Sequence, residues 1–90
     1  MVQVVWTRPA LASLETIRAY ISQFSPLAAQ RMALRLTAAG MSIADFPERG
    51  RAIGKGRREL AAVPPYLIRY RIKGELVEIL AVRHGARSPD

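Results

Sequence analysis

The chain has 90 residues, no cysteine and a net charge of +7. A chain of this length forms one small domain with a thin hydrophobic core, so we expect residues 1–90 to be a single domain. The lack of cysteine excludes disulfides and thiolate metal ligands for this sequence. Half of the residues are hydrophobic, which is normal for a folded protein and argues against disorder.

The positive charge is concentrated in the second half of the chain. Residues 1–48 hold four arginines and three acidic residues, a net charge of +1. Residues 49–90 hold ten lysines and arginines and four acidic residues, a net charge of +6. We therefore expect the second half to bind an anionic partner, either nucleic acid or an acidic protein. Composition alone does not distinguish these two kinds of partner.

Nothing in the sequence indicates a membrane protein or an exported one. No apolar run approaches the roughly 20 residues that a membrane-spanning helix needs. Met1 leads directly into residues 2–6 without the basic region and cleavage site of a signal peptide. We therefore expect a soluble, cytoplasmic protein.

The first half of the chain predicts one strand and two helices. Residues 2–6 alternate and are rich in β-branched side chains, as in a strand. Thr7 is the expected N-cap of a helix that ends before Ser25, and Ser25 caps a second helix that ends at Pro47. The short connection predicts an antiparallel hairpin. Its apolar stripes are Leu11, Leu14, Ile17, Ile21 and Phe24 in the first helix and Ala28, Met32, Leu36, Ala39, Ile43 and Phe46 in the second.

The second half predicts a loop and then strands. Residues 49–58 are basic and rich in glycine, and we interpret them as a loop. Residues 58–63 are then expected to form a short strand that is closed by Pro64-Pro65. Residues 76–83 carry apolar side chains on both faces, which indicates a central strand rather than an edge strand.

Residues 66–73 predict a half-buried strand with two different faces. The apolar set is Tyr66, Ile68, Tyr70 and Ile72, and the cationic set is Arg69, Arg71 and Lys73. Because side chains alternate along a strand, the apolar set is expected to face the core and the cationic set to face outward. Lys73-Gly74 suits a two-residue hairpin turn, since glycine supplies a positive φ.

These elements predict an α+β fold of order β-α-α-β-β-β. In it, an N-terminal strand and an antiparallel two-helix hairpin accompany a mostly antiparallel four-stranded sheet, with the hairpin packed on one face. Gly40 disfavours the last turns of the second helix by about 1 kcal/mol relative to alanine. Trp6, Tyr66 and Tyr70 are expected to face the core, so exposed aromatic platforms for single-stranded nucleic acid are not expected.

Two motifs are weak candidates for chemistry. The stretch from Gly50 to Gly54-Lys55-Gly56 superficially resembles a phosphate-binding loop, but its spacing is wrong and it lacks the magnesium-binding Ser or Thr. His84 is the only histidine, so with no cysteine a zinc site of the usual kind is not expected, and we expect no metal and no cofactor. A hydrogen-bonding role at the end of the last strand is the preferred interpretation of His84.

Arg69, Arg71 and Lys73 on one strand face raise the question of metal-free RNA cleavage. Such a reaction needs cations to stabilise charge on phosphorus, together with a general acid and a general base. The cations are present, but a convincing acid–base pair is not. We therefore favour a solvated face that binds an acidic partner.

Segments that match one known protein family run along nearly the whole chain. They are Val4-Val5-Trp6-Thr7 with Ala10, Leu14, Ile17, Tyr20 and Ile21; then Ala28-Ala29 and Phe46-Pro47 with Gly50-Arg51; then Arg58-Glu59-Leu60, residues 66–72, residues 77–82 and His84-Gly85-Ala86-Arg87. In this order and at these spacings they resemble the RelE/ParE superfamily of toxins from type II toxin–antitoxin systems, and its ParE branch in particular.

The resemblance implies a toxin that inhibits DNA gyrase by protein–protein contact and is neutralised by a cognate antitoxin in a hetero-oligomer. The alternatives are a RelE-like, ribosome-dependent mRNA endoribonuclease and a weakly toxic relative that only binds its antitoxin. The RelE pattern has an arginine where this chain has Leu67, and RelE-like chains often end in a Tyr or His where only Ser88-Pro89-Asp90 follow Arg87.

The resemblance and the charge pattern together give the expected site residues. Those expected to contact the target or the antitoxin are Arg57, Arg58, Arg69, Arg71, Lys73, Arg83 and Arg87. If the chain is a nuclease, the candidate catalytic residues are Arg69, His84 and Arg87. Alanine in place of Arg69, Arg71 or Arg87 is expected to change the stability by no more than about 0.5 kcal/mol, as at most surface positions.

Overall fold

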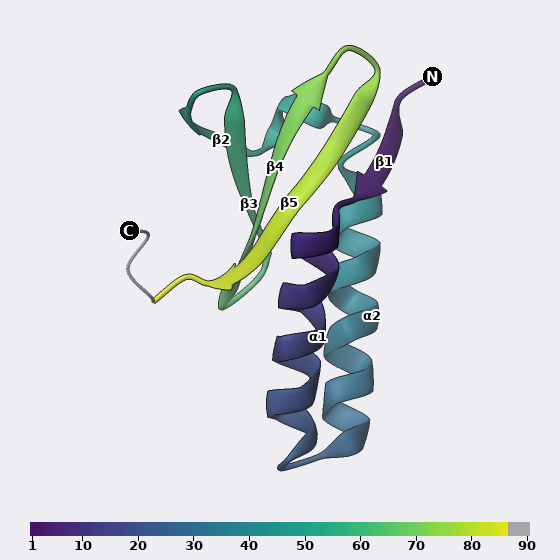
Figure 1. Ribbon diagram of the computed structural model, residues 1–90, viewed down its shortest axis with the longest axis vertical. Coiled ribbons are helices and arrows are strands. Elements are labelled where there is room, and N and C mark those ends of the chain that lie inside the picture. The colour runs from purple at the N-terminus through teal and green to yellow at the C-terminus, as the bar shows by residue number, and fades with distance from the viewer. Residues whose placement is uncertain (87–90) are drawn as a thin grey trace.

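A mixed β-sheet carries two antiparallel helices against one of its faces in the computed structural model, which describes residues 1–86 (Figure 1). The elements in chain order are β1 (Gln3–Trp6), α1 (Arg8–Ser22), α2 (Pro26–Ser42), a 3-10 turn (Pro47–Arg49), β2 (Arg51–Gly54), β3 (Arg57–Val63), β4 (Tyr66–Lys73) and β5 (Leu76–His84). The strand order is β1-β5-β4-β3-β2, with β1 parallel to β5 and all other neighbours antiparallel. The predicted α+β fold, the helical hairpin and the central position of β5 are confirmed.

The segment predicted to be a loop, residues 49–58, is where the structure differs from the expectation. Arg51–Gly54 forms a fifth strand, β2, which pairs with β3 and makes the sheet five-stranded rather than four-stranded. The β2–β3 turn places Gly54, Lys55 and Gly56 at positive φ, and this explains the glycines. With four residues and a single large apolar side chain, Ile53, the strand has no periodicity for sequence analysis to detect.

The ends of the other elements shift by a few residues. α2 ends at Ser42, before the end that the sequence predicted at Pro47. The β4–β5 hairpin pairs Lys73 with Leu76, so the two turn residues are Gly74 and Glu75 rather than Lys73 and Gly74. Gly74 has a φ of +59°, as the sequence predicted for the glycine of this turn.

Both predicted N-caps are present, and one of them also joins a helix to the sheet. The Thr7 hydroxyl accepts a hydrogen bond from the Ala10 amide at 3.3 Å and donates one to the Ile79 carbonyl at 2.7 Å. The Ser25 hydroxyl accepts one from the Ala28 amide at 3.1 Å. Side-chain caps of this kind satisfy amides that have no partner within the helix. Thr7 therefore fixes the start of α1 beside the central strand.

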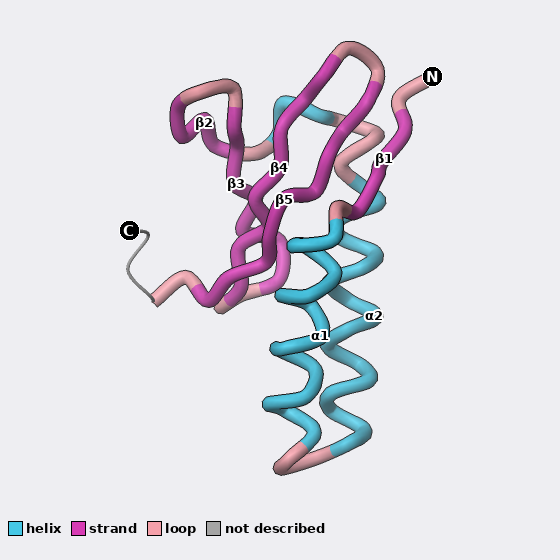
Figure 2. The backbone as a smooth tube through the Cα atoms, viewed as in Figure 1, coloured by secondary structure: helices cyan, strands magenta, loops and turns pink. Residues whose placement is uncertain are grey.

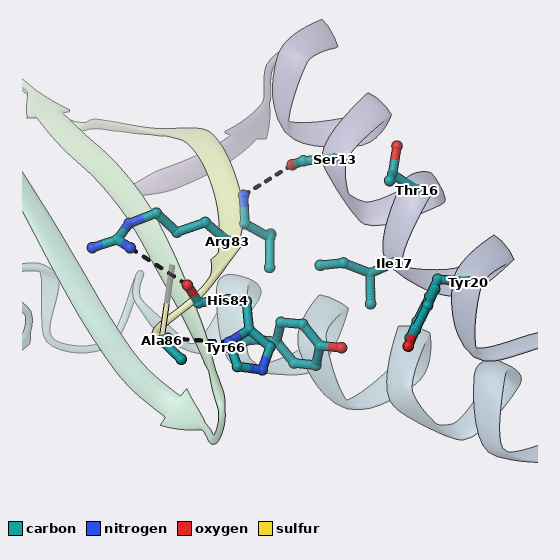
Figure 3. Close-up of a pocket in the computed structure, with 9 residues that line it drawn as sticks. Ser13, Thr16, Ile17, Tyr20, Tyr66, Arg83, His84 and Ala86 are labelled. Carbon is teal, nitrogen blue, oxygen red and sulfur yellow. Dashed lines mark hydrogen bonds between the residues drawn. The ribbon is translucent and has the colours of Figure 1, made fainter. Parts of the chain in front are cut away.

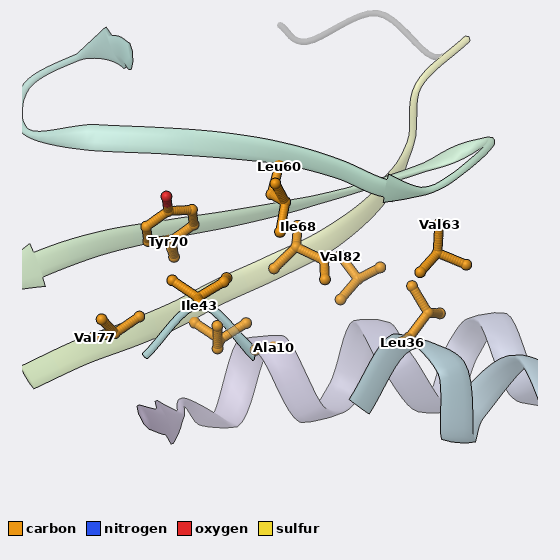
Figure 4. Close-up of a cluster of buried hydrophobic side chains, with 10 residues drawn as sticks. Ala10, Leu36, Ile43, Leu60, Val63, Ile68, Tyr70, Val77 and Val82 are labelled. Atoms are coloured by element: carbon orange, nitrogen blue, oxygen red, sulfur yellow. The ribbon is translucent and has the colours of Figure 1, made fainter. Parts of the chain in front are cut away.

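The hydrophobic core is the layer between the helices and one face of the sheet (Figure 4). Its fully buried large side chains are Leu36 and Ile43 from the helical layer and Ile68, Tyr70, Val77 and Ile79 from β4 and β5. Tyr70 is also a polar connector within this layer. Its hydroxyl donates to the Pro47 carbonyl at 2.5 Å and accepts from the Gly50 amide at 2.9 Å.

Gly40, which disfavoured the end of α2 in the sequence, has a packing role. A Cβ atom at this position would lie 2.6 Å from the Trp6 ring atom Cζ2. Such a distance is too short for two carbon atoms, so only glycine lets α2 approach the Trp6 ring this closely. The helix-propensity cost of Gly40 is therefore offset by the contact between β1 and α2.

The two helices extend beyond the sheet, and their far ends have no strand to pack against (Figure 2). Four residues of the predicted apolar stripes are exposed, which corrects the prediction that they are buried: Leu11, Phe24, Ala28 and Phe46. Phe24 and Ala28 lie at the connection between the two helices, beyond the sheet. Phe24 is 73% exposed and makes an edge contact with the exposed ring of Tyr20, with centroids 5.5 Å apart. The aromatic residues of the strands, Trp6, Tyr66 and Tyr70, are half-buried or buried. Neither helix in residues 1–86 is long and apolar enough to cross a membrane.

Replacement of Tyr70 should separate the packing of its ring from the hydrogen bonds of its hydroxyl. We expect Tyr70→Ala to lower the free energy of unfolding by about 3–5 kcal/mol, because the ring is fully buried. Tyr70→Phe keeps the ring and should cost about 1–3 kcal/mol, since the Gly50 amide loses a buried partner. Urea unfolding measures both, with Tyr20→Ala as an exposed aromatic control. Equal losses in Tyr70→Ala and Tyr20→Ala would contradict this description of the core.

Candidate functional site

The alternation of side chains in β4 divides the candidate residues between two sides of the sheet. Ile68 and Tyr70 point into the core, whereas Arg69, Arg71 and Lys73 lie on the face that no helix covers. The predicted strand register is therefore confirmed. We call this open side the arginine face, and its arginines are Arg51, Arg57, Arg69, Arg71 and Arg83.

The centre of the arginine face is a carboxylate, Glu59 of β3. Arg69 donates to Glu59 Oε2 from Nη2 at 2.9 Å and from Nε at 3.2 Å. Arg83 donates to Oε2 from Nε at 3.0 Å and to Oε1 from Nη2 at 3.3 Å. Arg51 lies at 3.5 Å from Oε1. Glu59 is only 2% exposed, so this is a buried anion surrounded by guanidinium groups from β2, β4 and β5.

The arginines determine the charge state of Glu59. Burial by itself raises the pKa of a carboxyl group, but hydrogen bonds from Arg83 and Arg69 and the charges of both outweigh burial. The pKa of Glu59 is therefore lowered, and the side chain is ionised at neutral pH. The ionised carboxylate accepts well-aligned, charge-assisted hydrogen bonds and holds Arg69 and Arg83 in fixed positions.

The remaining cations of this face are less constrained. Arg71 donates from Nε to Glu78 Oε1 at 2.6 Å, and both side chains are partly exposed. Hydrogen bonding to Arg71, opposed by partial burial and aided by the nearby positive charges, lowers the pKa of Glu78. Lys73 is exposed at the end of β4. Arg57 lies opposite Arg71 in the β3–β4 ladder, and its Nε is buried without a hydrogen-bond partner among the described residues.

Arg58 lies on the other side of the sheet from the rest of the predicted contact set. It is opposite Tyr70 in the β3–β4 ladder, and it donates to the carbonyls of Gly50 at 2.8 Å and Glu48 at 3.1 Å. These bonds hold the chain between the 3-10 turn and β2. The structure therefore gives Arg58 a structural role in connecting these segments.

The contacts of Arg69 change the expectation for its replacement. The side chain faces outward as predicted, but it is bonded to a buried carboxylate instead of being surrounded by water. Removing it would leave Glu59 with one fewer counter-charge in a site with little water, and this is costly. The expected loss for Arg69→Ala is therefore larger than the 0.5 kcal/mol of a free surface residue.

A second candidate surface is an open groove of about 890 Å³ between α1 and the end of β5 (Figure 3). It is lined by Ser13, Thr16, Ile17, Tyr20, Tyr66, Val82, Arg83, His84 and Ala86. The Ser13 hydroxyl accepts a hydrogen bond from the Val82 amide at 2.9 Å, on the stretch of β5 that lies beyond its pairing with β1. This hydrogen bond joins the helix to the strand at the base of the groove.

His84 lies in this groove, as the predicted hydrogen-bonding residue at the end of the last strand. Its Nδ1 accepts from the Ala86 amide at 3.1 Å, and its ring packs edge-on against Tyr66 with centroids 5.6 Å apart. His84 pairs with Tyr66 in the β4–β5 ladder, on the side of the sheet that faces the helices. It is therefore separated from Arg69 by the sheet itself.

The structure does not bring the candidate nuclease residues together. Arg69 lies on the arginine face and His84 lies on the helix side, while Arg87 lies outside the described residues. Across residues 1–86, no three His, Asp or Glu side chains gather in a way that would hold a metal ion. Glu59, the centre of the arginine face, is not among the site residues that the sequence predicted. The sequence held one indication of this role, because Glu59 is an acidic residue inside a predicted strand. Acidic residues are rarely buried unless they are paired.

Replacement of Glu59 should weaken the fold in a pH-dependent way. At pH 7 we expect Glu59→Gln to lower the free energy of unfolding by about 1–3 kcal/mol, because Arg69 and Arg83 lose charge-assisted bonds. The lowered pKa means that ionised Glu59 stabilises the fold above its unfolded pKa of about 4.3, and that this stabilisation disappears as the pH falls through the folded value. The gap between wild type and variant should therefore shrink in acid.

Thermal melts at pH 7 and at a series of acidic pH values measure this gap. Glu75→Gln is the matched control, because Glu75 is exposed and pairs only with the chain terminus among the described residues, so its loss should be small at every pH. A Glu59→Gln melting temperature equal to wild type at pH 7 would show that the carboxylate does not organise the arginine face.

Comparison with known proteins agrees with this fold and this chain length. A family model described as the ParE toxin of the type II toxin–antitoxin system, parDE, matches residues 4–89. Toxin RelE2 of Caulobacter vibrioides is 61% identical over 87 residues, which cover 97% of this chain and 99% of that protein. Toxin RelE1 of the same organism is 36% identical over 70 residues, which cover 73% and 74% of the two chains.

A solved structure described as the chromosomal ParDE TA system from P. aeruginosa is similar in fold. Its TM-score is 0.81 at 24% identity, and the match covers 93% of this chain and 96% of that chain. The likeness at this identity supports the fold alone, whereas the family model and the sequence relatives carry the assignment. This chain belongs to the ParE toxin family of type II toxin–antitoxin systems.

Proposed function

We propose that this toxin acts in the cytoplasm by binding and inhibiting DNA gyrase, and that a cognate antitoxin neutralises it in a hetero-oligomer. The observation that carries the proposal is the separation of the candidate nuclease residues, since Arg69 and His84 lie on opposite sides of the sheet. A general acid or base on one side cannot reach a phosphate held on the other. Inhibition by protein–protein contact needs no such assembled site.

The pairing of the arginine face supports the same proposal. Arg69 and Arg83 are bonded to the buried Glu59, so their charges are already partly compensated within the molecule. Arg51, Arg71 and Lys73 are the more exposed cations of the described part of this face. Exposed cations around an internally paired centre suit a contact with an acidic protein surface better than a phosphate-binding centre.

The RelE-like alternative has one observation in its favour. The relative that is 61% identical is named a RelE toxin, while the family model is that of ParE toxins. Leu67, where the RelE pattern has an arginine, is half-buried beside Gly85 and carries no charge. A direct test with both targets is therefore the first experiment for this chain.

We expect the purified protein to inhibit supercoiling of relaxed plasmid by DNA gyrase and to leave ribosome-bound mRNA intact. An electrophoretic supercoiling assay and primer extension on translating ribosomes measure the two activities. Site-specific cuts in mRNA that vanish in His84→Ala would overturn the proposal. Inactivity in both assays would favour the weakly toxic, antitoxin-binding alternative.

We expect the double replacement Arg71→Ala and Lys73→Ala to weaken gyrase inhibition while the fold is retained. Arg71 is partly exposed and its pair with Glu78 is a surface pair, so the stability loss should stay below about 1 kcal/mol. Arg8→Ala removes an exposed cation from the start of α1 and serves as the control. Equal inhibition by the double variant and by the Arg8 variant would exclude this part of the face from the gyrase contact.

We further propose that the antitoxin occupies the groove between α1 and β5 with an extended, acidic segment. The groove is lined by apolar Ile17 and Val82 and by the hydroxyl of Thr16, so one extended segment can bury apolar area and form hydrogen bonds there. The net charge of +7 should also accelerate the encounter with an acidic partner.

The association rate with the antitoxin should fall as salt rises, because exposed charges are screened over roughly 8–10 Å at physiological ionic strength. Stopped-flow kinetics at low and physiological salt measure this rate. Thr16→Arg places a large cation in the groove. This cation should either slow the dissociation of an acidic segment or prevent its binding by filling the groove. Either change would indicate that the segment lies in the groove. An association rate that is independent of salt would contradict the electrostatic part of the proposal.

A further inference from the structure

The solvent-facing side of α2 carries a regular apolar stripe that no described part of the chain covers. Leu27, Leu34 and Met41 are 54%, 64% and 50% exposed, and they recur at intervals of seven residues. Seven residues are almost two helical turns, so the three side chains lie in one row. The row is about 21 Å long at a rise of about 1.5 Å per residue.

Two further residues complete the pattern of this row. Arg31 and Ala38 fall between the large apolar residues, which gives the alternating spacing of four and three that defines a coiled-coil seam. In this register, Leu27, Leu34 and Met41 occupy d positions, and Arg31 and Ala38 occupy a positions. We call these five residues the outer seam of α2.

The outer seam lies on the opposite side of the helix from the core. The buried residues of α2 are Ala29, Leu36 and Gly40, and Leu34 is separated from Leu36 by about 200° around the helix axis. A helix that is apolar on two opposite sides is typical of one that is buried on both. In the described residues α1 and the sheet cover only the inner side (Figure 1).

The charges along α2 indicate which kind of surface fits the outer seam. The helix contains Arg31 and Arg35 and no acidic residue. Arg35 occupies an e position that flanks the seam, and Arg31 lies within it. A second copy packed antiparallel about Leu34 would bring the two Arg35 side chains together, and like charges at flanking positions disfavour pairing. A helix with acidic flanks would instead pair with both arginines.

We propose that the outer seam of α2 is the docking surface for an amphipathic helix with apolar a and d residues and acidic flanks. The identification of this helix as part of the antitoxin rests on the proposed function, whereas the chemistry of the surface does not. Arg31 requires an acidic side chain in the facing layer, so it fixes one register of the partner helix, as single charged residues do at core positions of coiled coils. Leu34 is the central anchor.

A synthetic probe tests the chemistry without a known partner. The probe is an acetylated peptide of roughly 21 residues with leucine at a and d, one glutamate at a to face Arg31, and glutamate at e and g. A peptide of the same composition in scrambled order has the same charge and no seam. Fluorescence anisotropy with the full chain should show binding of the first peptide and much weaker binding of the second.

The variants place the binding on the seam. Leu34→Glu should weaken binding of the probe by about 30-fold, the loss expected for a central anchor. Ala19→Glu adds the same charge to the exposed side of α1 and should leave binding unchanged. Arg31→Glu should weaken binding of the glutamate probe and strengthen binding of a lysine version. Both seam positions are exposed, and thermal melts verify that the variants remain folded.

Three outcomes would overturn the proposal. Equal binding of the ordered and scrambled peptides would show attraction by net charge alone. Equal binding by wild type and Leu34→Glu would place the peptide elsewhere. A wild-type dimer in sedimentation that Leu34→Glu dissolves would assign the seam to a second copy. If the protein inhibits growth and an antitoxin relieves this inhibition equally well in Leu34→Glu, the assignment of the seam to the antitoxin fails while the proposed function stands.

Discussion

The apolar layer between the helices and one face of the sheet is the contact on which the rest of the structure depends. Leu36 and Ile43 meet Ile68 and Tyr70 in this layer, and all four are buried. A chain of this size has side chains for one such layer only. The other face of the sheet must therefore be stable without a hydrophobic cover, and the far ends of the helices must do without the sheet. The open arginine face and the exposed outer seam of α2 both follow from this limit.

The uncovered face of the sheet is stabilised by charge. Glu59 of β3 accepts hydrogen bonds from Arg69 and Arg83, so cations from the neighbouring strands β4 and β5 lie together around a buried carboxylate that offsets their mutual repulsion. The same arrangement limits what the face can do. Arginines that are bonded to an internal carboxylate are poorly placed to stabilise a phosphate, and His84 lies behind the sheet. The charge network therefore supports the proposal of a protein target rather than chemistry on RNA.

The uncovered ends of the helices have a different character, because they are apolar rather than charged. Phe24 and Leu27 lie near the connection of the hairpin, and the outer seam continues along α2 to Met41. An exposed apolar row is unfavourable in water and promotes aggregation when the protein is alone. In a complex, a partner helix can bury it. The proposed complex with an antitoxin would cover such a surface.

The sequence by itself determined the order of the elements, their caps and the orientation of their side chains. Thr7, Ser25 and the alternation from Tyr66 to Lys73 act within a few residues, so local patterns predict them correctly. Only the tertiary structure decided which strands become neighbours, and this pairing created β2 and brought Glu59 to Arg69 and Arg83. It also decided which apolar residues are covered. The periodicity of Phe24 and Leu34 shows on which side of a helix they lie, but burial depends on whether another element faces that side, and none does here within residues 1–86.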